Sequence, residues 1–233
     1  MQTFSDQELG LIEIRQNPTA KRCIIRLKPD RISLTVPVGI SQEYALRFLN
    51  EKRGWILAHK DKVQRPKKIS VSENPIKTLT FSINLQASPR KNLLFSLQNG
   101  VLNILYPQNE ILENENIQSK IRQGIESALR FEAKRFLPER LRKLSEKHNL
   151  PFSDIKIRQS KSRWGSCSSK KNINLSYFLL LLPEYLVDYV LLHELCHTKE
   201  MNHSPRFWLL LNQLTDGKAK LLAKEIKQYR TEF

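Results

Sequence analysis

The sequence predicts an α+β protein, with a β-rich N-terminal region over residues 1–110 and a more helical domain over residues 111–233. Three observations carry this prediction. Short apolar or alternating segments between turn residues fill the first region, which is typical of strands. Apolar residues recur every four positions after residue 114, which indicates a long helix. The run His193-Glu194-Leu195-Cys196-His197, followed by His203, indicates a helix end that gathers several ligating side chains.

The N-terminal region should consist of strands with one helix between them. Strands are expected at residues 11–14, 23–27, 32–36, 78–86, 93–98 and 101–106. Lys28-Pro29-Asp30 is a turn sequence, and Asn99-Gly100 predicts a hairpin between the last two strands. Ser41 is a suitable N-cap for a single helix that runs to about Lys60.

A long helix is expected from about Asn114 to His148, with isoleucines at positions 117, 121 and 125 on its inner side. Pro138 should kink or divide this helix, because proline has no backbone N–H and clashes with the preceding turn. Short strands follow at residues 155–158, 163–167 and 173–175, and turn residues separate them. We expect these strands to form a small antiparallel sheet.

The helix that carries the first two histidines should begin at Pro183 and be buried, because apolar residues nearly surround it. His193 and His197 share one helix face, so both can ligate one metal ion. Zinc accepts imidazole nitrogen, and a catalytic zinc site uses three protein ligands and a water molecule. Glu194 is turned about 100° from His193, from where its carboxylate can reach such a water as a general base.

His203 is the expected third ligand if the chain turns back after the helix. Asn202 is a suitable left-handed stop, and Ser204-Pro205 predicts the N-cap and first position of a further helix over residues 206–215. Phe207 and Trp208 belong to an apolar set that can brace the loop. A last helix is expected over residues 218–229.

Other interpretations of these histidines exist. The spacing to His203 equals that of the metzincins, but Glu200 stands where that group has glycine and no methionine follows Met201, so we exclude this subclass. Glu200 itself stays an alternative third ligand, since carboxylates also bind zinc. Histidines that merely lie on a helix surface, or are satisfied in a core, are the remaining alternative.

Several segments together resemble the YgjP-like metallopeptidases, small bacterial and archaeal zincins similar to the SprT and Spartan proteases. They are Trp164-Gly165-Ser166-Cys167, Asn172–Leu175, Asp188-Tyr189-Val190, His193–His197, Asn202–Trp208 and, upstream, Ala20–Arg22, Leu34–Pro37 and Lys52–Ile56. The resemblance implies a zincin-like catalytic domain with Zn²⁺ on His193, His197 and His203. It also implies that Glu194 is the general base and that the substrate is a protein or peptide.

Two further features of such a peptidase are expected from its chemistry. A second electrophile would help to stabilise the oxyanion, and Arg163, Tyr177 and Tyr185 are candidates. An edge strand beside the metal helix should pair with the extended substrate, either around residues 164–168 or around residues 172–176.

The formal net charge of +16, from 39 basic and 23 acidic residues, favours acidic partners, and nucleic acid is therefore a further expected partner. Basic runs at residues 60–68 and 158–163 strengthen this expectation. Three cysteines, an odd number far apart, and the lack of a secretory start predict a reducing cytoplasm. Cys196 is expected to pack as a small apolar residue, and so is Cys167, for which a thiol that lines the cleft is the alternative. The longest apolar stretch, residues 177–182, is too short to cross a membrane.

Two other functions remain open. In one, the chain is a nucleic-acid-binding module with a structural or vestigial zinc site, which would require a fourth protein ligand. In the other, it is a zinc hydrolase of a non-peptide amide or a nucleotide, for which a phosphate-binding glycine loop would be evidence. The chain has seven glycines and no such loop.

Overall fold

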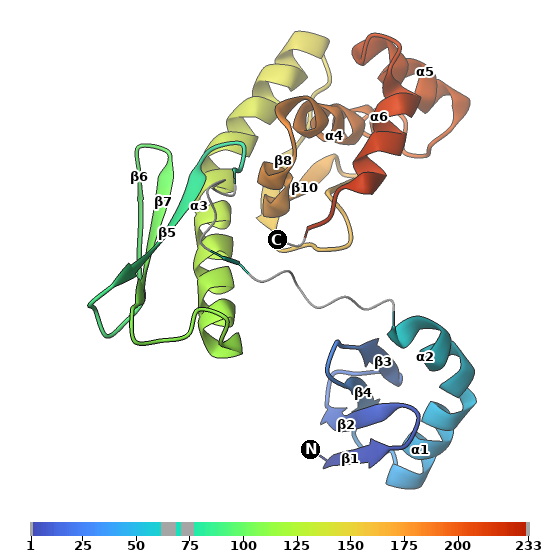
Figure 1. The fold of residues 1–233 in the computed structure, drawn as a ribbon. Helices are drawn as coiled ribbons and strands as arrows, with labels where there is room; N and C mark the ends of the chain where they lie inside the picture. Colours follow the sequence, from blue (N-terminus) through green and yellow to red (C-terminus); the bar gives the residue numbers. More distant parts are fainter. Residues whose placement is uncertain (1, 62–68, 71–76, 232–233) are drawn as a thin grey trace. The chain divides into compact units, whose positions relative to one another are not determined.

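The computed structural model describes residues 2–61, 69–70 and 77–231, so the basic run at 60–68 lies mostly outside the described residues. The chain forms two compact units, residues 1–67 and 68–233, each with its own hydrophobic core (Figure 1). The α+β class is as expected. The division differs from the expected boundary at residue 110, because the strands of residues 82–107 share a core with the long helix.

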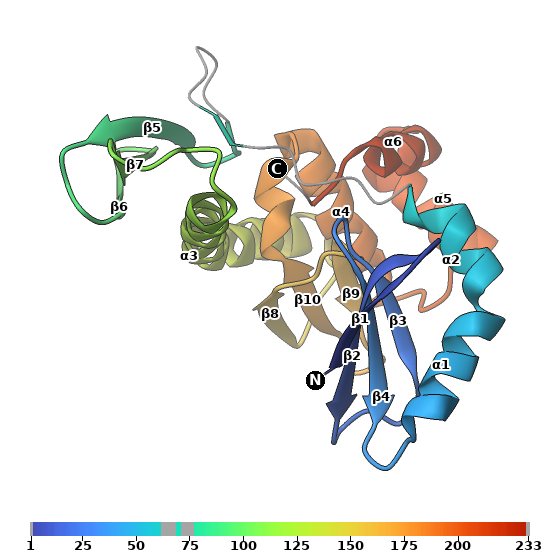
Figure 2. The same ribbon diagram turned by 60° about the horizontal axis from the view of Figure 1, so that its bottom comes forward.

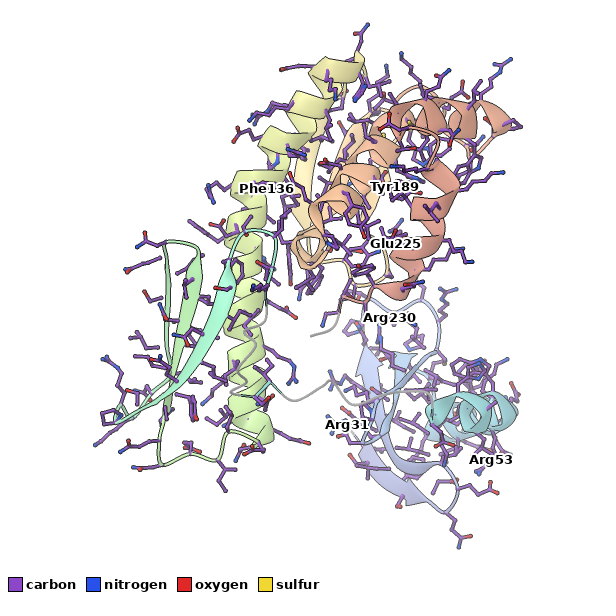
Figure 3. The ribbon with its side chains drawn as sticks, turned by 45° about the horizontal axis from the view of Figure 1, so that its top comes forward. Arg31, Arg53, Phe136, Tyr189, Glu225 and Arg230 are labelled. Carbon is purple, nitrogen blue, oxygen red and sulfur yellow. The ribbon has the colours of Figure 1, made fainter. Side chains whose placement is uncertain are left out.

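The N-terminal unit is a four-stranded sheet covered by two helices (Figure 2). Its elements are β1 (Gln2–Asp6), β2 (Gly10–Asn17), β3 (Ile24–Leu27), β4 (Ile32–Pro37), α1 (Gln42–Glu51) and α2 (Arg53–Lys60). Ser41 caps α1 by accepting from the Tyr44 N–H at 3.2 Å. One helix was expected here, but Lys52 leaves helical geometry (φ −97°, ψ 2°) and separates α1 from α2. Arg53, labelled in Figure 3, pairs with Asp6 and so fastens α2 to β1.

The second unit begins with a three-stranded sheet against a 34-residue helix. Its elements are β5 (Ser82–Ser88), β6 (Leu94–Gln98), β7 (Val101–Pro107) and α3 (Glu115–His148). The expected hairpin turn is confirmed, because Asn99 and Gly100 both have positive φ. Pro138 does not divide α3. Asn149 ends the helix in the left-handed conformation, at φ 51° and ψ 51°.

A second three-stranded sheet follows α3 and consists of β8 (Asp154–Arg158), β9 (Gly165–Cys167) and β10 (Asn172–Ser176). The expectation of an antiparallel sheet is wrong for one pair. The strand order is β8-β10-β9, with β10 antiparallel to β9 but parallel to β8. The turn after β9, with Lys171 at φ 58°, closes the β9–β10 hairpin and leaves the far side of β10 for β8. Strand β9 therefore lies at an edge of this sheet.

The same strand arrangement occurs three times in the described chain. In β2–β4, β5–β7 and β8–β10, the first strand is parallel to the third and the second strand is antiparallel to it. A helix follows each set along the chain. The sequence shows no repeat, so this similarity is visible only in the backbone topology.

The remaining elements are a 3₁₀ turn (Tyr177–Leu181), α4 (Glu184–Cys196), α5 (Pro205–Leu214), α6 (Ala219–Glu225) and a last 3₁₀ turn (Ile226–Gln228). One half of α3 lies beside the β5–β7 sheet and the other beside α4 (Figure 1). Arg140 of α3 donates to both carboxylate oxygens of Asp188 on α4, at 2.7 and 2.6 Å. Such a bidentate pair fixes the angle and register of α4 as well as contributing energy.

Helix α4 is buried on nearly all sides, as the apolar pattern predicted. Cys196 is fully buried in the core, and the half-buried Cys167 packs against the same core. Both cysteines therefore behave as small apolar residues. Within the described residues, no helix is both long and apolar enough to cross a membrane.

Candidate metal centre

Three histidines converge at the C-terminal end of α4. This helix ends at Cys196, so His193 lies in its last turn and His197 is its C-cap. The Nε2 atom of His193 lies 3.2 Å from Nε2 of His197 and 3.0 Å from Nε2 of His203. Among the described residues, these three form the group of ligating side chains that could hold a metal ion.

The geometry of the three nitrogens fits a single cation. A proton on Nε2 of His193 could satisfy one of its two short contacts but not both. Zinc bound by imidazole at 2.0–2.1 Å in a tetrahedral arrangement brings its ligand nitrogens to about 3.3 Å from one another. Burial and the charges of His197 and His203 lower the pKa of His193 to about 3. His193 is therefore neutral near pH 7, as metal binding requires.

The His197 ring is oriented by a hydrogen bond from Nδ1, the ring nitrogen that does not point to the other histidines. Nδ1 lies 3.0 Å from the backbone carbonyl of Glu200, which assigns the proton to Nδ1 and leaves Nε2 as the free acceptor. Such a bond to the second nitrogen fixes the ring plane of metal-binding histidines. The carboxylate of Glu200, the alternative ligand, is not part of the converging group.

The chain returns to bring in His203, but not through the residue we expected. Asn202 is not among the described residues with positive φ, so the expectation of a left-handed stop there is wrong. Consecutive tight turns reverse the chain instead, with Thr198 N–H donating to Leu195 and Lys199 N–H donating to Cys196, both at 3.0 Å. Because each turn is closed by its own hydrogen bond, no left-handed residue is needed.

Ser204 and Pro205 begin α5 as the sequence predicted. Ser204 Oγ accepts from the Phe207 N–H at 3.3 Å, and Pro205 is the first helical residue. This cap places Phe207 beneath the histidines. Its ring centroid lies 4.9 Å from that of His193, 4.6 Å from His197 and 4.7 Å from His203. The fully buried Phe207 ring is thus a common floor for all three imidazoles.

Glu194 lies beside this group with its carboxylate buried. The residue is 5% exposed, and its Oε2 atom has no hydrogen-bond partner among the described residues. Burial raises the pKa of Glu194 to about 8, while the positive charge of Arg163 acts in the opposite direction. A buried carboxyl group with an unpaired oxygen is suited to accept or hold a proton.

Strand β9 approaches Glu194 so closely that a side chain at position 165 would force the Glu194 side chain to shift. A Cβ atom on Gly165 would lie 2.6 Å from Oε1 of Glu194 and 2.7 Å from its Cγ. The sequence contained Gly165 in a distinctive motif but gave no sign that this residue contacts Glu194. The contact is between segments far apart in the chain, so spacing could not reveal it.

The three candidates for a second electrophile are distinguished by their partners. The buried Tyr177 donates its hydroxyl to Glu126 at 3.0 Å. Tyr185 donates to Glu225, which Figure 3 labels on α6. Arg163 is exposed just before β9, and its charge acts on Glu194. Among the three, Arg163 is the residue whose positive charge acts on the buried Glu194 carboxyl group, by lowering its pKa.

Comparison with known proteins identifies relatives of this chain. Residues 21–229 match the model of the YgjP-like metallopeptidase domain family. One similar crystal structure is the metallopeptidase zymogen of Pyrococcus abyssi abylysin, at 26% identity over 40% of this chain and 93% of that chain, with a TM-score of 0.37. Another is the zymogen of Methanocaldococcus jannaschii jannalysin, at 26% identity over 38% and 90% of the two chains, with a TM-score of 0.34. No curated protein matches the sequence.

The approach of β9 to Glu194 predicts the effect of one methyl group. Replacement of Gly165 by alanine should displace the Glu194 carboxylate and lower turnover by about 100-fold, since a 1 Å misplacement can have that effect. Metal content, measured by elemental analysis, should stay unchanged. Gly54→Ala is the matched control, because nothing lies within 4 Å of a Cβ there. Full activity of the Gly165→Ala variant would contradict a functional role for this contact.

Proposed function

The chain belongs to the YgjP-like metallopeptidase family, and from that premise we propose that it hydrolyses peptide bonds at a zinc site formed by His193, His197 and His203. The convergence of their three Nε2 atoms is the observation that carries the proposal. Zinc, when bound, supplies Lewis-acid chemistry that lowers the pKa of a water toward about 7 and polarises a carbonyl. Three imidazole nitrogens suit zinc better than magnesium or calcium, which prefer oxygen ligands.

Glu194 serves as the general base in this proposal. Its buried carboxylate takes the proton of the attacking water and later delivers it to the leaving amine. Two observations support the role: Oε2 has no hydrogen-bond partner among the described residues, and burial raises the pKa of Glu194 to about 8. A base whose pKa lies near the working pH transfers protons in both directions efficiently.

Substrate binding is proposed along the edge of β9 that has no strand partner among the described residues. This strand pairs with β10 on one side, and the absence of a side chain on Gly165 lets the strand lie close to Glu194. An extended peptide that adds a strand there would receive main-chain hydrogen bonds, which gives affinity with little dependence on side chains. This mode favours a peptide over the non-peptide amide or nucleotide that we considered as an alternative.

Arg163 is proposed to stabilise the oxyanion of the transition state. Its side chain is exposed at the entry to β9, and the hydroxyls of Tyr177 and Tyr185 are engaged elsewhere. A guanidinium group placed where negative charge develops is a common form of electrostatic catalysis.

The role of Glu194 can be tested with an isosteric substitution. Glu194→Gln should lower kcat by about a thousandfold, because general acid–base catalysis typically contributes 10²–10⁴-fold, while stoichiometric zinc is retained. Glu200→Gln is the matched control and should retain both zinc and activity. Loss of zinc from the Glu200→Gln variant would show that Glu200 is a metal ligand. A robust activity that survives Glu194→Gln would exclude the proposed mechanism.

The role of Arg163 can be tested with a charge series. Arg163→Ala should lower kcat by about 100-fold with little change in KM, as loss of one oxyanion donor typically does, and Arg163→Lys should restore part of the loss. Arg158→Ala, which removes an exposed arginine of β8, is the control. If Arg158→Ala and Arg163→Ala lower kcat equally, the loss of positive charge near the site, and not a specific contact of Arg163, explains the effect.

A nucleic-acid partner is proposed in addition, on the basis of the net charge of +16. DNA or RNA binding should weaken steeply with salt, because bound lysines and arginines displace counterions from phosphates. A binding titration between 50 and 200 mM salt measures this slope, and a flat response would remove nucleic acid from the list of partners. A pure binding module with a structural zinc is less well supported, since three and not four ligating side chains converge among the described residues.

A cytoplasmic location also stays a proposal. It is supported by the three cysteines, all of which are free thiols in the structure.

A further inference from the structure

A surface cavity of about 660 Å³ begins at His203 and extends along α5. Its lining includes Pro205, Trp208, Leu209 and Asn212 of α5 and Lys220 of α6. His203 therefore belongs both to the group of converging histidines and to the lining of this cavity.

The cavity wall follows from the amphipathic character of α5. Phe207 and Leu211 lie one turn apart and are buried in the core. Pro205, Trp208, Leu209 and Asn212 occupy the i, i+3, i+4 and i+7 positions of the adjoining stripe, which faces the cavity. Leu209 is 64% exposed there. An exposed leucine next to a half-buried tryptophan, beside a chemically active histidine, is a surface suited to an apolar ligand.

The far end of the cavity is held in place by the connection between α5 and α6. Asp216 and Gly217 both have positive φ and reverse the chain tightly. The Gly217 N–H donates to the Asn212 carbonyl at 2.8 Å, and Asn212 Oδ1 accepts from the Ala219 N–H at 3.4 Å. Because these bonds fix the two helices relative to each other, the cavity is built into the fold.

We propose that this cavity is a specificity subsite that binds a large apolar side chain of the peptide substrate, next to the cleaved bond. The inference rests on the proposed function and adds a preference to it. Successive residues of an extended peptide are about 3.3 Å apart, so a substrate whose carbonyl lies at the histidines places a neighbouring side chain beside His203. Leucine, methionine and phenylalanine match the apolar wall. Lysine and arginine are disfavoured, because Lys220 contributes a like charge.

A cleavage-site survey tests the subsite. The zinc-loaded protein is incubated with a proteome digest made by a glutamate-specific protease, and cleaved bonds are identified by mass spectrometry. One fixed position relative to the cleaved bond should be enriched in leucine, methionine and phenylalanine over alanine by about tenfold, as apolar pockets discriminate. Basic residues should be depleted at the same position.

Two matched variants separate the subsite from general effects. Leu209→Asp should abolish the apolar enrichment and admit lysine and arginine. Leu221→Asp is the control, because Leu221 is similarly exposed (62%) on α6 but does not line the cavity. Neither substitution should change zinc content or thermal stability, since both side chains are largely in solvent. Unchanged selectivity in Leu209→Asp, or a change of oligomeric state in place of selectivity, would overturn the proposal.

A binding measurement distinguishes failure of the subsite from failure of the proposed function. Zinc-loaded Glu194→Gln is titrated with two peptides that differ by leucine or alanine at one position, and calorimetry gives the two dissociation constants. If the wild type cleaves no bond but leucine still binds about tenfold tighter, the peptidase function fails and the subsite stands. If bonds are cleaved without apolar enrichment, the function stands and the subsite is rejected.

Discussion

The structure around the candidate site depends on one constraint, which is that the Nε2 atoms of His197 and His203 lie 3.2 and 3.0 Å from Nε2 of His193 at the end of a buried helix. One proton on Nε2 of His193 cannot satisfy both of its short contacts, and burial disfavours a positive charge on this imidazole by lowering its pKa. A bound cation, as we propose, would accept a lone pair from each of the three nitrogens. The cap at Ser204, the floor formed by Phe207 and the bond from His197 to the Glu200 carbonyl all serve to hold the rings in this geometry.

The scaffold supports this arrangement from two sides. On one side, the bidentate pair between Arg140 and Asp188 joins α4 to α3 with a defined geometry, and His193 and His197 lie at the end of α4. On the other side, β9 presents a glycine to Glu194 and is an edge strand of its sheet among the described residues. The same arrangement of three strands occurs three times in the chain, and it is the third copy whose following helix carries the histidine run. The strand arrangement is therefore shared by all three sheets, whereas the converging histidines follow the third sheet alone among the described residues.

Several expectations failed for identifiable reasons. The boundary at 110 assumed that neighbouring strands along the chain belong together, whereas burial joins β5–β7 to α3. The antiparallel sheet assumed consecutive pairing, but the β9–β10 hairpin leaves β8 to pair in parallel on the far side. A left-handed Asn202 was unnecessary because tight turns reversed the chain first. Each failed expectation concerns which segments pack, pair or hydrogen-bond with one another, and the residues next to a segment in the sequence do not determine that choice.

By itself, the sequence determined what depends on neighbours along the chain. The spacing of His193 and His197 on one helix face, the caps at Ser41 and Ser204 and the Asn99-Gly100 turn follow from backbone geometry over a few residues. Only the tertiary structure decided which strand is the edge, that Gly165 lies against Glu194, and that Phe207 underlies three imidazoles. These contacts join distant segments, and packing selects them through the burial of whole faces, so no single spacing in the sequence could reveal them.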